Sequence, residues 1–377
     1  MSTLIQRTQI SQKEDNHFSV ASWGPMQKRG PKYHRSDETK AKFANTRTTE
    51  LDLHIIANLA AYHLLPSSLL ARLVNGNDRV IYRHLQKLYH LGLLDRFHIP
   101  RPAGKNPGEF IYLIHSSAAL DWLVEHGWAE TADLDYERVK RDRERPHSDL
   151  LDPQKAEEVQ GRLQFARHEL MISRFHAMVD LACDKSNGEV ELVDWRQGRE
   201  LHQWVDVPKA RYDNQLDLWG ETGTVERLPH RPDAFFTLRF PKREGDAQET
   251  SFFYEADRKT TNTTRFNEKL RAHFQYVVKQ RHHVQHYGVN RIRAVLIETL
   301  TPHWAEELRA AARHPLVSGK NPSPLFWFTT STLFTHGPKA EGDENDSATP
   351  FFLSNPKIVF ASIWATPAAD ALSSLVE

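Results

Sequence analysis

Apolar residues recur at helical spacing in three consecutive segments between residues 51 and 91. The first segment, Leu51 to Leu65, has apolar positions at Leu53, Ile56, Leu59, Ala60 and Tyr62. Pro66 restarts the chain into a second, short helix that ends near Val74. The third segment, Asp78 to Leu91, follows a turn and directs Ile81, Leu85 and Leu88 toward a core. The pattern predicts three helices in close succession.

The third of these helices leaves a polar face with the side-chain types that reach phosphates and base edges in DNA. That face carries Arg79, Tyr82, Arg83, Gln86 and Lys87. Leu93 to His98 and Phe110 to Ile114 follow as two strands, joined by a basic loop that contains Arg101 and Lys105. Helices followed by such a hairpin predict a winged helix-turn-helix domain over residues 51–128, although many winged helices make protein contacts instead.

Local charge favours DNA as the partner of this region. From Asp78 to Lys105 there are six Lys plus Arg against two acids, whereas the formal net charge of the whole chain is +0. A basic excess confined to one region favours phosphate. We therefore expect double-stranded DNA to bind here.

The hydrophobic pattern changes after residue 160, where helices and strands alternate. A long amphipathic helix is predicted from Gly161 to Cys183. Strands are predicted at Val190 to Trp195, Ala234 to Leu238, Phe252 to Asp257, Ile292 to Glu298 and Leu325 to Thr329. Helices are predicted at Thr264 to Val278 and from about Pro302 to Arg313. The order predicts a mixed sheet flanked by helices, which gives the chain an α+β or α/β fold.

Candidate chemistry lies at Asp233, before one predicted strand, and at the end of the next. Side chains two apart on a strand share a face, so Glu255, Asp257 and Lys259 are expected to point the same way. Carboxylates suit Mg²⁺ or Mn²⁺, with Asp233, Glu255 and Asp257 as the metal ligands, and a lysine can position the attacking water. The alternative is a solvated strand face with cross-strand charge pairs.

These residues resemble the PD-(D/E)XK restriction-endonuclease-like superfamily. The Glu-X-Asp-Arg-X-Thr stretch from Glu255 to Thr260, together with the N-terminal DNA-binding module, resembles the replication-relaxation family of plasmid and mobile-element proteins over most of residues 50–330. The resemblance implies a nuclease-like core with Asp233, Glu255, Asp257 and Lys259 as catalytic residues.

The motif register stays open. If Asp257-Arg258-Lys259 is the triplet, the set of two acids and one lysine is complete. If the triplet is Glu255-Ala256-Asp257, the lysine position holds aspartate, and Lys269 of the following helix is the candidate replacement. The second register leaves the site altered or inactive unless Lys269 takes over.

Two hypotheses of function follow. The first is a metal-dependent endonuclease or nickase acting on plasmid or mobile-element DNA. The second is an inactive DNA-binding accessory or regulatory protein for replication, relaxation or transcription, in which basic residues hold the DNA backbone. That basic set is Arg258, Arg265, Lys269 and Arg271. A homodimer and other proteins of the same element are further candidate partners.

Histidines give two weaker signals. His282 and His286 have a spacing that suits a transition metal, but no third ligand is evident. His168-Glu169, on the first core helix, is expected to be a solvent-facing pair, with the alternative that Glu169 approaches Asp233.

Composition sets the remaining expectations. The 377 residues divide into a basic arm (1–50), the winged helix (51–128), a charged linker (129–160) and a nuclease-like domain with a C-terminal extension (161–377). The single cysteine, Cys183, excludes a disulfide framework and fits a reducing cytoplasm. No apolar run reaches membrane-spanning length, so no membrane partner is expected.

Overall fold

The computed structural model describes residue 43 and residues 47–99, 109–144, 156–213, 218–259, 262–337, 350–369 and 371–376. Side chains at 156–161, 213, 218 and 221 lie outside this description. The chain divides into two compact units, with the boundary between Gln160 and Gly161. Of the predicted segments, the arm before residue 43 and the loop with Arg101 and Lys105 lie outside the described residues.

The N-terminal unit combines helices with a small antiparallel sheet. Its helices are α2 (Glu50–Tyr62), α3 (Ser67–Leu73), α4 (Asp78–His90), α5 (Ser117–Glu125), the short 3₁₀ turn Thr131–Asp133 and α6 (Tyr136–Glu144). Its strands, β1 (Leu65–Pro66), β2 (Leu94–Phe97) and β3 (Ile111–Ile114), pair in the order β1-β3-β2. The three predicted helices and both predicted strands are therefore present. Part of the segment assigned to a linker or helix is α6, whose Asp142 lies 2.8 Å from Nε2 of His63.

Helix α4 has the predicted division into buried and exposed positions, with one exception. Asn77 caps its N-terminus by accepting from the Arg79 N–H at 3.0 Å, which satisfies a backbone donor that the helix cannot pair itself. Ile81 and Leu85 are fully buried, as the spacing predicts. Lys87 differs from the prediction, because its side chain is buried.

The burial of Lys87 has an electrostatic cause. Its ammonium donates to Asp52 Oδ2 at 2.5 Å and to the Arg47 carbonyl at 3.1 Å. Asp52 also lies 2.8 Å from Nδ1 of His84. Burial alone would raise the pKa of Asp52, but Lys87, His84 and Thr49 outweigh it and lower that pKa. The expectation that Lys87 faces outward is wrong, because the buried carboxylate of α2 pairs with it.

The C-terminal unit is built on a seven-stranded mixed sheet, ordered β12-β11-β10-β9-β8-β7-β4. The strands are β4 (Glu191–Gln197), β7 (Ala234–Arg239), β8 (Glu249–Asp257), β9 (Ile292–Thr299), β10 (Phe326–Thr330), β11 (Trp364–Ala365) and β12 (Leu372–Ser373). The central pairs β8·β9 and β9·β10 are parallel, and the outer pairs are antiparallel. All five strands predicted in this unit are present, and the fold class is mixed α+β.

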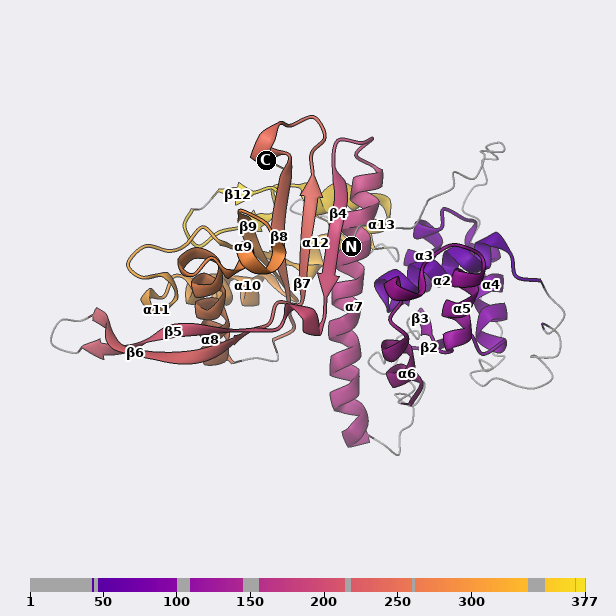
Figure 1. The fold of residues 1–377 in the computed structure, drawn as a ribbon, viewed down its shortest axis with the longest axis horizontal. Coiled ribbons are helices and arrows are strands. Elements are labelled where there is room, and N and C mark those ends of the chain that lie inside the picture. The colour runs from indigo at the N-terminus through magenta and orange to yellow at the C-terminus, as the bar shows by residue number, and fades with distance from the viewer. Residues whose placement is uncertain are drawn as a thin grey trace. The chain divides into compact units, whose positions relative to one another are not determined.

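Helices cover both faces of this sheet (Figure 1). One face packs against α8 (Thr263–Phe274), α10 (Pro302–Ala312) and α11 (Pro315–Ser318), through a core that includes Phe253, Leu270 and Leu308. The other packs against α7 (Ala156–Asp184), whose Phe175 ring stacks on Tyr254 with centroids 4.0 Å apart. Alternation along β8 therefore sends Phe253 and Glu255 to the α8 face and Tyr254 to the α7 face.

The remaining helical elements of this unit are short. They are the 3₁₀ turns Arg199–Leu201, Gly245–Ala247 and Pro356–Phe360, the π-helix Gln275–Lys279, α9 (His282–Tyr287), α12 (Ser331–His336) and α13 (Phe351–Ser354). The π-helix continues directly from α8. In the part of the chain that the structure describes, no helix is both long and apolar enough to span a bilayer.

A long two-stranded ribbon is inserted in the chain between β4 and β7, which are themselves neighbours in the sheet. Its strands, β5 (Gln203–Asp213) and β6 (Leu218–His230), pair only with each other and project from the sheet (Figure 1). At its base Val205 and Val207 are 1% exposed and pack against the α8 core. The sequence pattern did not predict this ribbon.

Candidate functional site

Strand pairing places Asp233 opposite Glu255. Ala234 of β7 is in register with Tyr254 of β8, and the Asp233 N–H donates to the Tyr254 carbonyl at 3.1 Å. The ladder thus extends one residue past β7, and the two carboxylates meet at the end of β8. Glu255 is 2% exposed, so its charge needs partners within the protein.

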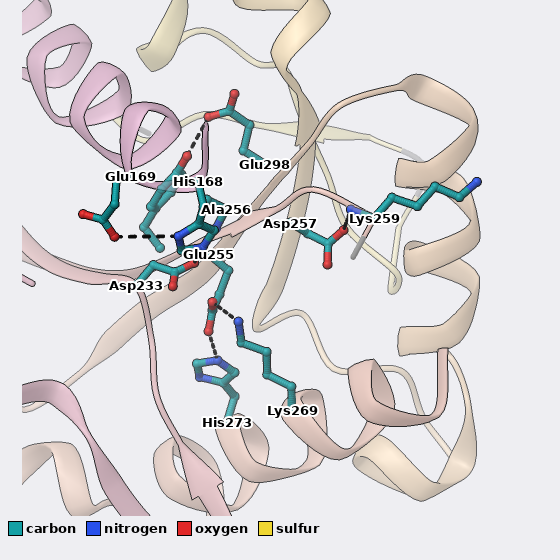
Figure 2. Close-up of polar contacts among 11 residues, drawn as sticks. His168, Glu169, Asp233, Glu255, Ala256, Asp257, Lys259, Lys269, His273 and Glu298 are labelled. Carbon is teal, nitrogen blue, oxygen red and sulfur yellow. Dashed lines mark hydrogen bonds and ion pairs between the residues drawn. The ribbon is translucent and has the colours of Figure 1, made fainter. Parts of the chain in front are cut away.

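Two side chains of α8 supply those partners (Figure 2). The Lys269 ammonium pairs with Glu255 Oε2, and His273 Nε2 lies 2.6 Å from Oε1. Lys269 and His273 are four residues apart and therefore share one helix face. The other nitrogen of His273 lies 3.0 Å from Nε2 of His230, so a buried histidine pair supports the carboxylate.

The charges of this cluster are strongly coupled. Burial raises the pKa of Glu255; the Lys269 charge opposes that rise and the Asp233 charge reinforces it. Burial would lower the pKa of Lys269, but Glu255, Asp233 and, more weakly, Asp257 outweigh it, so the pKa of Lys269 is raised. The ammonium is therefore charged at neutral pH and lies in the field of three carboxylates.

Asp233 has its own partners, drawn from α7 and β8. Its Oδ2 accepts from the Ala256 N–H at 2.8 Å and lies 3.2 Å from Nε2 of His168. Burial alone would raise the pKa of Asp233, but Lys269, His168 and Ala256 hold it well below its usual range. Burial alone would lower the pKa of His168; the hydrogen bond to Asp233 and the nearby Glu169 carboxylate outweigh this and raise it to about 10.

The expectation that His168-Glu169 forms a solvent-facing pair is therefore wrong, because His168 is a direct partner of Asp233. Glu169 lies beside it, with Oε1 3.9 Å from Nδ1 of His168. The pair contributes to the site through its histidine rather than through the glutamate that the sequence suggested.

Asp257 and Lys259 are placed differently from the first pair. Asp257 Oδ1 accepts from the Trp304 indole N–H at 2.6 Å and from the Lys259 N–H at 2.9 Å. Strand β8 ends at Asp257, and Lys259 has a left-handed backbone (φ 58°). Alternation stops there, and the exposed Lys259 ammonium lies over the Trp304 ring, 4.7 Å from its centroid. Lys269, not Lys259, contacts a carboxylate of the cluster (Figure 2).

A second buried carboxylate lies on the opposite face of the sheet. Glu298 accepts from the Tyr254 hydroxyl at 2.7 Å and from the Ser331 hydroxyl at 2.5 Å, and it pairs with Arg174 of α7. These three partners satisfy both of its oxygens. We assign this cluster a structural role, because it ties α7 and α12 to the central strands.

The four basic residues that the accessory-protein hypothesis assigned to the DNA backbone have different surroundings in the structure. Lys269 is held by Glu255, and Arg271 donates to Glu226 at 2.9 Å and to the Pro208 carbonyl at 2.7 Å. Arg265 is exposed. Burial lowers the pKa of Arg258, and the charges of Arg167 and Arg174 lower it further, so a cationic region adjoins the end of β8.

The side chains that could bind a divalent cation at this site are the carboxylates of Asp233 and Glu255. Two carboxylates, with water and substrate phosphate, are a common Mg²⁺ ligand set, and Asp233 and Glu255 supply them. Within the described residues, no group of three or more His, Cys, Asp and Glu side chains has a metal-binding arrangement. His286 contacts the Tyr276 hydroxyl at 2.8 Å and His282 contacts Gln280 at 2.7 Å. A cation held by Asp233 and Glu255 would have to displace the Lys269 ammonium from Glu255 Oε2.

Sequence reasoning missed His230, His273 and Trp304 as members of the site. The spacing of Lys269 and His273 was a usable signal, since side chains four residues apart share one face of the predicted helix. Trp304 and His230 carried no such signal, because their contacts depend on pairing between distant segments.

The predicted DNA-contacting residues of the N-terminal unit lie on one helix. Arg79, Tyr82, Arg83 and Gln86 of α4 are exposed, and Tyr82 is 39% exposed. Arg101 and Lys105 lie outside the described residues. Four of the five predicted positions on this helix are therefore accessible to a partner.

Fold and site together define a mixed α+β protein with a small helical N-terminal unit and a sheet that carries paired carboxylates. The family model described as replication-relaxation matches residues 56–292, and the chain belongs to that family. Membership associates the chain with replication or relaxation of plasmid and mobile-element DNA. No curated protein and no solved structure matches the chain.

Proposed function

We propose that this protein is a DNA-binding endonuclease or nickase that requires Mg²⁺ or Mn²⁺ and acts on plasmid or mobile-element DNA. The observation that carries the proposal is the meeting of Asp233, Glu255 and Lys269. Two acids on adjacent strands and one amine from the next helix are the groups that metal-dependent phosphodiester hydrolysis uses. The sheet would then be a PD-(D/E)XK-like core whose lysine comes from α8.

The N-terminal unit fits a winged helix-turn-helix that holds double-stranded DNA. Its element order and its β1-β3-β2 sheet support this assignment. Helix α4 would be the recognition helix, with Arg79, Arg83 and Gln86 toward the major groove. Lys87 is excluded from that contact, because Asp52 holds its ammonium.

Each residue of the site has a role in this proposal. Asp233 and Glu255 would hold the cation, which lowers the pKa of a bound water and offsets charge on the scissile phosphate. Lys269 orients that water or neutralises the phosphate, and its raised pKa keeps it charged. His168 fixes the Asp233 carboxylate, and His273 fixes that of Glu255. Asp257, held by Trp304, lies at the margin of the cluster.

A second function is favoured by one specific observation. Both oxygens of Glu255 are already matched by protein cations or donors, namely Lys269 and His273. Such a satisfied ion pair is also the arrangement of a structural site. The alternative is therefore a non-cleaving DNA-binding accessory protein in replication or relaxation.

Conversion of supercoiled plasmid to nicked or linear product, with Mg²⁺ or Mn²⁺, tests the proposal. Asp233→Asn and Lys269→Met should each lower the rate by about 100-fold or more, since each removes a group that stabilises charge in the transition state. Lys259→Met is the matched control and should leave the rate within about threefold, because its ammonium lies over Trp304.

Two results would contradict this assignment. Loss of cleavage in Lys259→Met but not in Lys269→Met would restore the register Asp257-Arg258-Lys259. Absence of cleavage by the wild-type protein, with salt-sensitive duplex binding retained, would favour the accessory role.

A further inference from the structure

An exposed tryptophan lies at the base of the β5–β6 ribbon. Trp204 is 51% exposed, which is unusual for a large aromatic side chain in a unit with an extensive core. Two guanidinium groups accompany it: Arg227 lies 5.7 Å and Arg231 5.6 Å from its ring centroid. Both arginines are themselves exposed. The described ribbon thus presents an aromatic face flanked by positive charge.

The strand register explains how these three side chains meet. Trp204 of β5 is directly opposite Pro229 of β6. Arg227 is two residues before Pro229 and therefore shares its side of the strand, and Arg231 follows one residue past the end of β6. Both guanidinium groups lie close to the indole, which stays half exposed.

A second aromatic pair lies farther along the same ribbon. Tyr212 and Trp219 are in register, with ring centroids 5.4 Å apart, and they are 39% and 37% exposed. Lys209 and Arg211 are exposed between the two aromatic positions. The described part of the ribbon therefore carries a second exposed aromatic pair, preceded along β5 by two exposed basic side chains.

The acidic residues of the ribbon do not cancel this pattern everywhere. Glu226 is paired with Arg271, so its charge is compensated within the protein. Asp206 stands opposite Arg227 in the register and is exposed. Asp206 shares the face of Trp204 and offsets part of the Arg227 charge, so a negatively charged ligand would be attracted mainly to the Arg231 end of the base.

The ribbon base leads directly to the carboxylate site. Only Pro232 separates Arg231 from Asp233, which limits their Cα separation to about 7 Å. A polynucleotide that contacts Arg231 would therefore pass close to Asp233.

We propose that the β5–β6 ribbon binds a single-stranded segment of DNA next to the Asp233–Glu255 site, with a base stacked on Trp204 and phosphates held by Arg227 and Arg231. The inference rests on the proposed function of that site. An indole stacks only on a base whose face is open, and stacking platforms combined with basic side chains are typical of single-strand binding. The ribbon would thus hold the strand that is opened or released during relaxation.

Binding of a labelled oligo-dT 20-mer to the full chain, measured by fluorescence anisotropy in EDTA, tests this proposal without requiring cleavage. Trp204→Ala should weaken binding by about 5- to 150-fold, because stacking on one aromatic side chain contributes about 1–3 kcal/mol. Val225→Ala is the matched control, since Val225 lies on the same ribbon and is 62% exposed. It should bind as the wild-type chain does.

Salt dependence separates the two kinds of contact. Each phosphate contact with single-stranded DNA contributes about 0.7 to the slope of log K against log salt. Arg227→Ala combined with Arg231→Ala should therefore lower the slope, whereas Trp204→Ala should leave the slope unchanged while reducing affinity. A Trp204→Phe chain should recover part of the lost affinity.

The outcomes distinguish this proposal from the nuclease proposal. Trp204-dependent binding in a chain that never cleaves plasmid would support the ribbon and overturn the catalytic assignment. Unchanged affinity in Trp204→Ala, or an equal loss for duplex DNA, would overturn the ribbon proposal. The proposal would also be overturned if affinity for the oligo-dT 20-mer fell in Arg83→Ala, in α4, but not in Trp204→Ala, because the N-terminal unit would then bind the single strand.

Discussion

At the scale of single residues, the site depends on where β8 ends, because side chains point to alternate faces of the sheet only within the strand. Glu255 lies within β8 and follows the alternation, but Lys259 lies two residues past the end of β8 and has a left-handed backbone. The amine in the cluster is supplied by Lys269, from the helix that returns over the strand. The local motif and the three-dimensional site therefore differ by one lysine.

His168 provides a pH test of the site. The pKa of His168 is raised from 6.5 to about 10 in the folded protein. Its ion pair with Asp233 therefore contributes its full stabilisation of the fold below pH 6.5, and this contribution is lost as the pH rises through about 10. His168→Gln should lower the free energy of unfolding by about 1–3 kcal/mol at pH 6, and the difference from wild type should vanish near pH 10.

Urea unfolding at a series of pH values measures this difference. His303→Gln is the control, because His303 is 81% exposed and pairs only with Glu307 of its own helix. A pH-independent difference for His168→Gln would show that packing, not charge, accounts for its contribution.

The sequence analysis placed Asp233 and Glu255 on neighbouring strands, and the structure brings them together, while their metal and catalytic roles stay predictions. Both positions follow from short-range rules, since Asp233 directly precedes one strand with a clear apolar pattern and Glu255 lies near the end of the next. The buried Lys87 and the contact between His168 and Asp233 could not be predicted in the same way. Each depends on a partner more than 30 residues away, and periodicity along one element carries no information about such pairs.

At the scale of elements, the ribbon is the main feature that the hydrophobic pattern missed. Only its base is packed, through Val205 and Val207, so only a short part of β5 shows the alternation of a half-buried strand. Beyond the base most described positions are exposed, although Trp219 contacts His314, and the segment has the composition of a loop. The predicted helices of the two cores have a buried face, and the predicted central strands are buried along nearly their whole length, so both produce a clear apolar pattern.

Arg271 connects the ribbon to α8 and should control its local stability. The guanidinium reaches Glu226 and the Pro208 carbonyl with two different nitrogens, a fork that lysine cannot reproduce. Arg271→Lys should reduce local protection at the ribbon base by about 1–3 kcal/mol, because a hydrogen bond to a buried charged group is lost.

Hydrogen exchange of amides in β5 and β6 measures that protection. Arg239→Lys is a control, because Arg239 is 42% exposed and pairs with Glu249 at the surface. Equal protection in Arg271→Lys and wild type would show that Val205 and Val207 alone hold the ribbon.

At the scale of the whole molecule, each unit has its own hydrophobic core. Leu85 of α4 is fully buried in the N-terminal unit, and Leu308 of α10 is fully buried in the C-terminal unit. Separate cores allow separate unfolding transitions, so a single free energy of unfolding need not describe the chain.

A matched pair of leucine truncations tests this independence. Leu85→Ala and Leu308→Ala should each cost about 2–5 kcal/mol, since each leaves a cavity in a closed core. In calorimetry or denaturant unfolding, each variant should shift only the transition of its own unit. A shift of both transitions by either variant would show that the two units unfold cooperatively.

The parallel strands at the centre of the C-terminal sheet also set an order in time. Strands β8, β9 and β10 pair only after the helices between them have been synthesised, whereas β2 and β3 of the N-terminal unit follow each other in sequence and that unit emerges first during synthesis. We therefore expect the nascent chain to fold its α4 surface while β9 is still unmade. If α4 binds DNA as proposed, a growing chain would bind DNA before its carboxylate site has been assembled.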